Sequence, residues 1–175
     1  MHNYELTTMK VATEYNLSIA IVDAIIMTES SGNPWAYNPE PHYRWFWNVR
    51  TNAPFRRVSD MEVASKRPPA DFPCLAGDPD QEWWAQQASW GLMQLVGAVA
   101  RESGFKGEYL TELCDPKINI NFGCKFLATL AKRHLPDYGW QGVLRAYNTG
   151  SPSPSSNGTH YLGKIASYYP NIYNA

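Results

Sequence analysis

A glutamate at the end of the most apolar helical pattern in the chain is the first residue that could do chemistry. Glu29 follows residues 19–27, whose Ile and Val side chains recur at helical spacing, and it precedes a turn of small residues. Burial disfavours the charged form of a carboxyl group. A glutamate that keeps its proton near neutral pH can serve as a general acid. The same pattern also fits a glutamate that ends a helix and points into solvent.

Two further segments carry side chains that suit the binding of polar groups. Residues 89–94 read SWGLMQ, where Gly91 allows a close backbone approach and Gln94 offers a donor and an acceptor. Residues 146–150 read AYNTG, where the phenol of Tyr147 can bond a carboxyl group and Asn148 can bond an N-acetyl amide. Taken singly, these segments are an ordinary helix start and an ordinary helix end.

In this order the three segments resemble the catalytic domain of lytic transglycosylases of the SLT type, which is related to goose-type lysozymes. The matching motifs are Glu29-Ser30-x-Gly-Asn-Pro, GLMQ at 91–94 and AYN-x-G at 146–150. Residues 115–120 (DPKINI) are also similar to that family, and so is a closing segment with Tyr161-Leu162-x-Lys164-Ile165 and Tyr168. The resemblance covers residues 17–37 and 88–173.

The resemblance implies a mostly α, lysozyme-like domain that cleaves the β-1,4 bond between N-acetylmuramic acid and N-acetylglucosamine without a cofactor or a metal. It makes Glu29 the single acid and base, which closes a 1,6-anhydro ring on the muramoyl product, and Tyr147 the partner of its carboxyl group. It gives Ser30 the role of shaping the turn that follows Glu29. The expected substrate-binding residues are Ser30, Gly91, Met93, Gln94 and Asn148, with Ser89 as the candidate for the groove serine of the family.

The chain departs from the family between the first two motifs, where residues 38–88 form a loop-rich insertion. Hydrolysis by two carboxylates would need a second acid roughly 5–9 Å from Glu29. The insertion supplies six candidates, Asp60, Glu62, Asp71, Asp78, Asp80 and Glu82, although charges in a surface segment are mostly solvated. Its rings fit either a wall of the glycan groove or a small second core: Tyr43, Trp45, Phe46, Trp47, Trp83 and Trp84.

The elements expected to position these residues are helices. The patterns predict helices over about 8–15, 18–29 (capped by Ser18), 91–102 (capped by Ser89), from Asp115-Pro116 onward and over 140–147. Thr159 is expected to cap a last helix before Pro170, in which Tyr161, Leu162, Ile165 and Tyr168 face inward. Two short helices inside the insertion are signalled by a capping box at 59–62 and by Asp78-Pro79. No strand is strongly indicated, and we expect one domain over 1–175.

Composition narrows the function further. A net charge of -1 and a near-neutral balance of charges argue against a nucleic-acid binder. Three cysteines lack metal-ligand spacing and are expected to be free thiols. The apolar run 19–27 is too short to span a bilayer, and residues 1–26 lack a signal-peptide pattern.

We therefore expect a monomer that acts on peptidoglycan glycan strands, as a phage endolysin passing from the host cytoplasm to the wall or as a virion-associated lysin. The alternatives are a hydrolytic muramidase on the same fold and a non-catalytic wall-binding or virion structural module.

Overall fold

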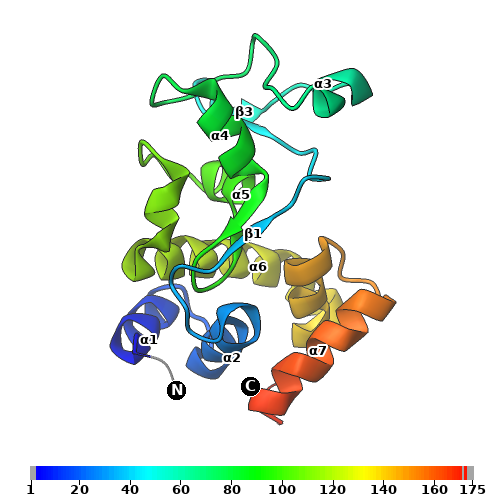
Figure 1. Ribbon diagram of the computed structural model, residues 1–175. Coiled ribbons are helices and arrows are strands. Elements are labelled where there is room, and N and C mark those ends of the chain that lie inside the picture. Colours follow the sequence, from blue (N-terminus) through cyan, green and yellow to red (C-terminus); the bar gives the residue numbers. More distant parts are fainter. Residues whose placement is uncertain (1–2, 171, 173–175) are drawn as a thin grey trace. The chain divides into compact units, whose positions relative to one another are not determined.

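The structure is a computed structural model that describes residues 3–170 and residue 172, and it is mostly helical, as predicted (Figure 1). The backbone divides into two compact units. The first consists of Met1–Gly32 and Gly123–Ala175, and the second of Asn33–Phe122. The first unit therefore contains the segments of Glu29 and Tyr147, and the second contains the insertion and the GLMQ segment.

The first unit is built from helices α1 (Glu5–Glu14), α2 (Ile19–Ser30), the later part of α6 (Pro116–Thr149) and α7 (Ser156–Tyr168). Helix α2 packs against both α1 and α7 (Figure 1). Its side chains Ile21, Val22, Ile25 and Ile26 are fully buried. Burial of each such side chain contributes roughly 1.5–3 kcal/mol, so the apolar residues that precede Glu29 anchor its helix in this unit.

Helix α6 begins where Asp115-Pro116 predicted. The Asp115 carboxylate accepts hydrogen bonds from the backbone N–H groups of Lys117 and Ile118, at 2.8 and 3.1 Å. Gly139 interrupts the helix with φ 60° and ψ −174°, and the predicted shorter helix over 140–147 is the part after this break. The helix stops at Gly150, whose φ is 76° and whose N–H bonds the carbonyl of Ala146.

The predicted cap of the last helix, Thr159, is wrong by four residues. Helix α7 begins at Ser156, and the cap is Ser155, whose hydroxyl accepts from the Gly158 N–H at 3.1 Å. Ser155 has the extended backbone that an N-cap requires, whereas Thr159 already lies within the helix. Tyr168, expected to face inward, is 44% exposed.

The second unit contains strands that the sequence did not indicate. An antiparallel sheet has the order β1-β4-β5, and a two-stranded ribbon joins β2 and β3. The elements of this unit are β1 (Tyr37–Pro39), β2 (Trp47–Asn48), β3 (Ala53–Pro54), α3 (Asp60–Ala64), α4 (Pro79–Gln86), β4 (Ala88–Trp90), β5 (Leu95–Val96), α5 (Gly97–Glu102) and a 3-10 helix η1 (Leu110–Cys114).

The predicted helix over 91–102 is therefore wrong in its first half. Ser89 lies in β4, where it pairs with Asn38 on one side and Val96 on the other, and it caps no helix. Gly91 and Gln94 have φ values of 70° and 45°, which a right-handed helix cannot contain. The conformation of this segment depends on pairing with β1, a strand distant in the sequence. Local periodicity carries no signal of that pairing and therefore predicted a helix.

Both short helices of the insertion are confirmed with their caps. The Ser59 hydroxyl accepts from the Glu62 N–H, and the Glu62 carboxylate accepts from the Ser59 N–H in return, which completes the capping box of α3. At α4, Asp78 accepts from the Gln81 N–H at 3.0 Å, and Pro79 occupies the first turn.

Some of the insertion's rings form a second core and others remain exposed. Phe46 stacks on Trp83 with centroids 4.1 Å apart, and Phe72 meets both rings edge-on. By contrast, Trp45 is 76% exposed and Trp84 is also exposed. The structural interpretation thus holds for Phe46 and Trp83, while the exposed rings keep surface that a ligand could contact.

Candidate active site

Glu29 lies in the last turn of α2, at the point where the helix stops. Ser31 has a left-handed φ of 53° and its N–H bonds the carbonyl of Met27. The Ser30 hydroxyl donates to the Ile26 carbonyl at 3.0 Å and accepts from the Gly32 N–H at 3.2 Å. Ser30 therefore forms hydrogen bonds within the turn that follows Glu29.

The carboxylate of Glu29 is held by a tyrosine from the last helix. The hydroxyl of Tyr161 donates to Oε1 of Glu29 at 2.8 Å, and the Tyr161 side chain is buried in α7. A donated hydrogen bond favours the ionised form of a carboxyl group. Because Oε1 accepts this bond, a proton carried by the acid would reside on Oε2.

Sequence analysis placed Tyr161 in the closing helix but gave it no role at the acid. Positions 29 and 161 are far apart in the chain, and only the packing of α7 against α2 brings them together. The available signal was the inward-facing position of Tyr161 in a segment similar to the family's closing helix.

Tyr147, in the last turn of α6, is electrostatically linked to Glu29. Burial raises the pKa of the Tyr147 phenol well above 10.0, and the negative charge of Glu29 raises it further. Its ring lies beside that of Phe126, with centroids 5.5 Å apart. The phenol thus stays protonated at neutral pH and keeps the O–H that a carboxylate partner would require.

A polar pocket of about 450 Å³ has Tyr161, the hydrogen-bond partner of Glu29, in its wall. Its lining residues come from the end of α6 and from α7: Asn148, Thr149, Asn157, His160, Tyr161 and Lys164. Asn148 was predicted to bind substrate, and its side chain is exposed there. Tyr161 is shared, since it lines the pocket and bonds Glu29. The sequence analysis gave Asn157, His160 and Lys164 no role.

In the second unit, the GLMQ segment forms a turn that is fastened by a buried asparagine. The amide nitrogen of Asn119 donates to the carbonyls of Trp90 and Leu113, and its oxygen accepts from the Met93 N–H at 2.8 Å. A Cβ on Gly91 would approach the Asn119 amide to 2.5 Å, so only glycine fits. Gly91 is thus required for packing within this turn.

The side chains of this segment differ in what they could contact. Gln94 donates to the carbonyls of Ala36 and Gly91, at 3.1 and 2.9 Å, and is partly exposed. Met93 is 0% exposed, which corrects the expectation that its side chain lines a sugar groove. Ser89 is buried, and its hydroxyl donates to Glu40 at 3.3 Å. Ser89 is buried because it lies in the central strand β4, and Met93 lies in the turn between β4 and β5.

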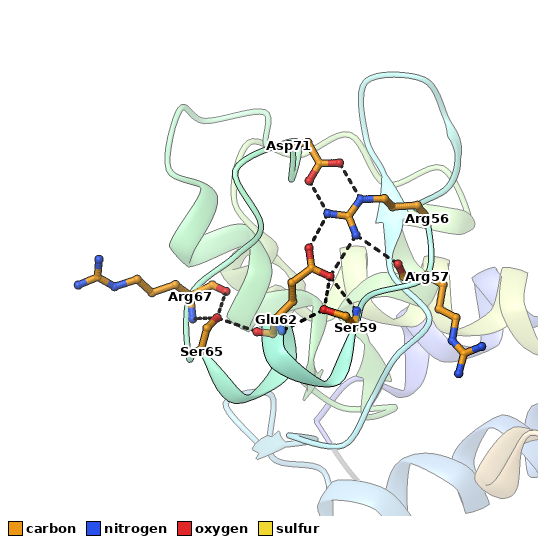
Figure 2. Close-up of polar contacts among 7 residues, drawn as sticks. All are labelled: Arg56, Arg57, Ser59, Glu62, Ser65, Arg67 and Asp71. Carbon is orange, nitrogen blue, oxygen red and sulfur yellow. Dashed lines mark hydrogen bonds and ion pairs between the residues drawn. The ribbon is translucent and has the colours of Figure 1, made fainter.

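Most carboxylates of the insertion have structural partners. Figure 2 shows Arg56 between two of them, with Nη2 2.6 Å from Glu62 Oε1 and 2.7 Å from Asp71 Oδ1. The hydrogen bond from Arg56 is the main cause that lowers the pKa of Glu62 to about 2, and it also lowers the pKa of Asp71. Both carboxyl groups are therefore ionised at neutral pH and unsuited to donate a proton.

Glu82 is also committed, because it forms a buried ion pair with Arg101. Their closest atoms are 2.7 Å apart, and a second bond runs from Arg101 Nε to Glu82 Oε1 at 2.9 Å. Arg101 also donates to the carbonyls of Phe105 and Gly107. With Asp78 capping α4, four of the six acids considered above have a local structural function.

The described residues give no indication of a metal centre or a membrane span. Within residues 3–170 and 172, no three His, Cys, Asp or Glu side chains are grouped so that they could hold a metal ion. None of the helices in that part of the chain has the length and apolarity needed to cross a bilayer. Cys74, Cys114 and Cys124 are free thiols, as predicted.

Comparison with known proteins gives two findings. The sequence model of the transglycosylase SLT domain family matches residues 7–161. The fold is similar to the X-ray structure of an inactive mutant of the lytic transglycosylase Slt from Pseudomonas aeruginosa, with a TM-score of 0.60 and 16% identity. The match covers 98% of this chain but only 24% of that protein. No curated protein matches the sequence.

Proposed function

Because the chain belongs to the family of transglycosylase SLT domains, we propose that it is a peptidoglycan lytic transglycosylase with Glu29 as its acid and base. The bond cleaved is the β-1,4 linkage between N-acetylmuramic acid and N-acetylglucosamine. The observation that carries this proposal is the position of Glu29, which ends a buried helix and accepts a hydrogen bond from Tyr161 beside a polar pocket.

The proposed reaction uses one carboxyl group twice. Glu29 first donates its proton to the glycosidic oxygen, which leaves with N-acetylglucosamine. The resulting carboxylate then removes the proton of the muramoyl C6 hydroxyl, and that oxygen attacks C1 to close the 1,6-anhydro ring. The second step returns the proton to Glu29, so no water is consumed. A positioned acid or base of this kind contributes roughly 10²–10⁴ in rate.

The neighbouring phenols support this cycle. The Tyr161 bond orients the carboxyl group and favours its ionised form, which the second step requires. Tyr147 keeps its proton at neutral pH, and we assign it as a second donor to Glu29 as the charge on the carboxyl group changes. Asn148 is assigned to an N-acetyl group of the substrate, and Gln94 to its hydroxyl or amide groups.

Ser30 acts in this proposal by holding the turn after the acid, and Gly91 by shaping the GLMQ turn. The burial of Met93 and Ser89 makes both of them supporting residues of the second unit.

A hydrolytic muramidase on the same fold is the second candidate. In that enzyme a water molecule, in place of the C6 hydroxyl, would attack C1 of the muramoyl sugar. A hydrolytic route with two carboxylates would also need a second acid. The structural partners of Glu62, Asp71, Asp78 and Glu82 favour the single-carboxylate reaction. A non-catalytic wall-binding or virion module would not need a buried tyrosine bonded to Glu29.

The composition of the products from purified peptidoglycan tests the activity. We expect mass spectrometry to find 1,6-anhydro-muramoyl ends, and Glu29→Gln to lower their rate of formation by about 10²–10⁴. The Pseudomonas aeruginosa neighbour is an inactive mutant in which a glutamate is replaced by glutamine. Reducing muramoyl ends would indicate hydrolysis instead. Cleavage by Glu29→Gln at the parent rate would contradict the catalytic assignment.

The biological role that we propose is a phage lysin, acting either from the host cytoplasm at lysis or from the virion at entry. A compact catalytic domain suits both settings. Expression in a bacterial cytoplasm tests the first: lysis should require a co-expressed membrane pore, and Glu29→Gln should abolish it. Lysis without a pore would contradict this route.

A further inference from the structure

We propose that the pocket beside Glu29 binds a carboxylate of the glycan substrate through Lys164, and that this contact sets the preference for charged substrates. The inference rests on the proposed function, because it concerns the same bound strand. It adds a specificity-determining role for Lys164, a residue of the closing segment to which the resemblance assigned no role.

The first support is the cation in the pocket wall. Lys164 and His160 lie four residues apart on α7, so both side chains lie on one face of the helix and line the same pocket. The Lys164 side chain is exposed. Among the residues that the structure describes, no carboxylate forms an ion pair with its ammonium group. The carboxylates of the described residues therefore leave this positive charge available to a ligand.

The second support is the polar character of the remaining wall. Asn148 and Asn157 bring amide groups that can donate and accept hydrogen bonds. The Thr149 hydroxyl donates to the Arg145 carbonyl and accepts from the Ser151 N–H, so the chain already uses it. Two amides and one ammonium group suit a ligand that presents an anionic oxygen pair next to polar groups, since charge-assisted hydrogen bonds are the stronger ones.

The third support is the link to the reacting bond. Tyr161 lines the pocket and donates to Glu29 at 2.8 Å. A group bound in the pocket is thus separated from the acid by a single side chain. A strand with its scissile bond at Glu29 would bring substituents of adjacent sugars to the pocket.

Peptidoglycan offers carboxylates in two places close to its sugars. The lactyl group of muramic acid is a free carboxylate when no peptide is attached. When a stem peptide is attached, the lactyl group is an amide and the carboxylates belong to the peptide. Lys164 would bind either carboxylate through the same charge-assisted hydrogen bond. The ligands of the test below distinguish the lactyl carboxylate from those of the stem peptide.

The test measures binding to Glu29→Gln protein, which should not consume the ligand. The ligands are a muramoyl tetrasaccharide with stem peptides, the same glycan with its peptides removed, and both glycans with their carboxyl groups methyl-esterified. We expect Lys164→Gln to weaken the free-acid form of at least one glycan by about tenfold, the effect of one lost charge-assisted bond. It should leave the esters unchanged, and Lys164→Arg should restore most of the affinity.

The matched control is Lys132→Gln, which removes an exposed lysine of α6 that does not line the pocket. Thermal unfolding of each variant checks that it is folded. The free-acid ligand that loses affinity identifies the source of the carboxylate. The proposal is overturned if Lys164→Gln binds all ligands like its parent, if it weakens acids and esters equally, or if no ligand binds measurably.

This measurement is independent of the activity test. If Glu29→Gln binds the free acids in a Lys164-dependent manner while the parent protein cleaves no glycan, then the catalytic proposal fails and the carboxylate site stands. If the parent forms anhydro products and Lys164→Gln changes neither binding nor substrate preference, then the carboxylate site fails and the activity stands.

Discussion

Two tyrosine side chains influence the same carboxyl group. Tyr161 does so through a direct hydrogen bond, and Tyr147 through its electrostatic interaction with Glu29. A phenol is a suitable neighbour for an acid that must act in both protonation states, because it donates to the carboxylate and its own proton is retained at neutral pH. The raised pKa of Tyr147 strengthens that retention.

We predict that Tyr161→Phe lowers the rate of glycan cleavage by about 10- to 100-fold, since a hydrogen bond to a charged group contributes roughly 1.5–3 kcal/mol. The carboxylate loses a donor that favours its ionised form, so the alkaline limb of the pH–rate profile, where the general acid loses its proton, should move to higher pH. Rates measured on purified peptidoglycan across pH check both effects. Tyr168→Phe, in the same helix and exposed, is the control. An unchanged profile for Tyr161→Phe would remove Tyr161 from the mechanism.

At the scale of elements, short strands and one buried ion pair shape the second unit. The pair of Glu82 and Arg101 joins α4 to α5, and both side chains are buried. Arg101, which belongs to α5, also donates to the carbonyls of Phe105 and Gly107 in the segment after that helix. One guanidinium group therefore connects α4, α5 and this segment. Removal of either charge would leave the other without compensation in the interior.

Arg101→Met is accordingly expected to reduce the free energy of unfolding by about 3–5 kcal/mol, because it leaves Glu82 buried and unpaired. The double variant Glu82→Met with Arg101→Met should recover much of this loss, since neither charge then remains. Urea unfolding of the parent, both single variants and the double variant measures the coupling. Additive effects of the two single changes would show that the pair makes no specific contribution.

The exposed cluster around Arg56 makes the helix α3 sensitive to acid (Figure 2). Glu62 has a folded-state pKa of about 2, below its ordinary value of 4.5. Its stabilising contribution is therefore present above about pH 4.5 and is lost as the pH falls toward 2. We expect the protection factors of the α3 amides, which correct for the intrinsic pH dependence of exchange, to fall over this window and to depend less on pH in Glu62→Gln. Equal pH dependence in the two proteins would contradict this assignment.

At the scale of the whole molecule, the chain forms two compact units, and the first is assembled from both ends of the sequence. Helix α6 runs without a terminus through the boundary between residues 122 and 123. We therefore retain the prediction that residues 1–175 behave as one domain.

This prediction is tested by calorimetry. One continuous helix shared by both units should couple their unfolding, so we expect a single transition with equal calorimetric and van't Hoff enthalpies. Two separated transitions, or a van't Hoff enthalpy well below the calorimetric one, would show that the units unfold independently.

Local patterns in the sequence were sufficient for several features of this protein. The start of α6 at Asp115-Pro116, both helix caps in the insertion and the turn after Glu29 follow from side chains that bond backbone groups within three residues. Such bonds need no distant partner, and a sequence therefore determines them directly. The three ordered motifs likewise sufficed to indicate the family.

Only the tertiary structure decided the features that depend on distant partners. Pairing of β1 with β4 made a strand of Ser89, and Asn119 held the GLMQ turn in a form that buries Met93. The packing of α7 against α2 brought Tyr161 to Glu29 and placed Lys164 in the adjacent pocket. These contacts join residues far apart in the chain, and their free energy comes from packing and from paired polar groups in the interior. Local periodicity contains no information about either, so the sequence indicated Glu29 as the candidate acid, while the fold determined which side chains contact it.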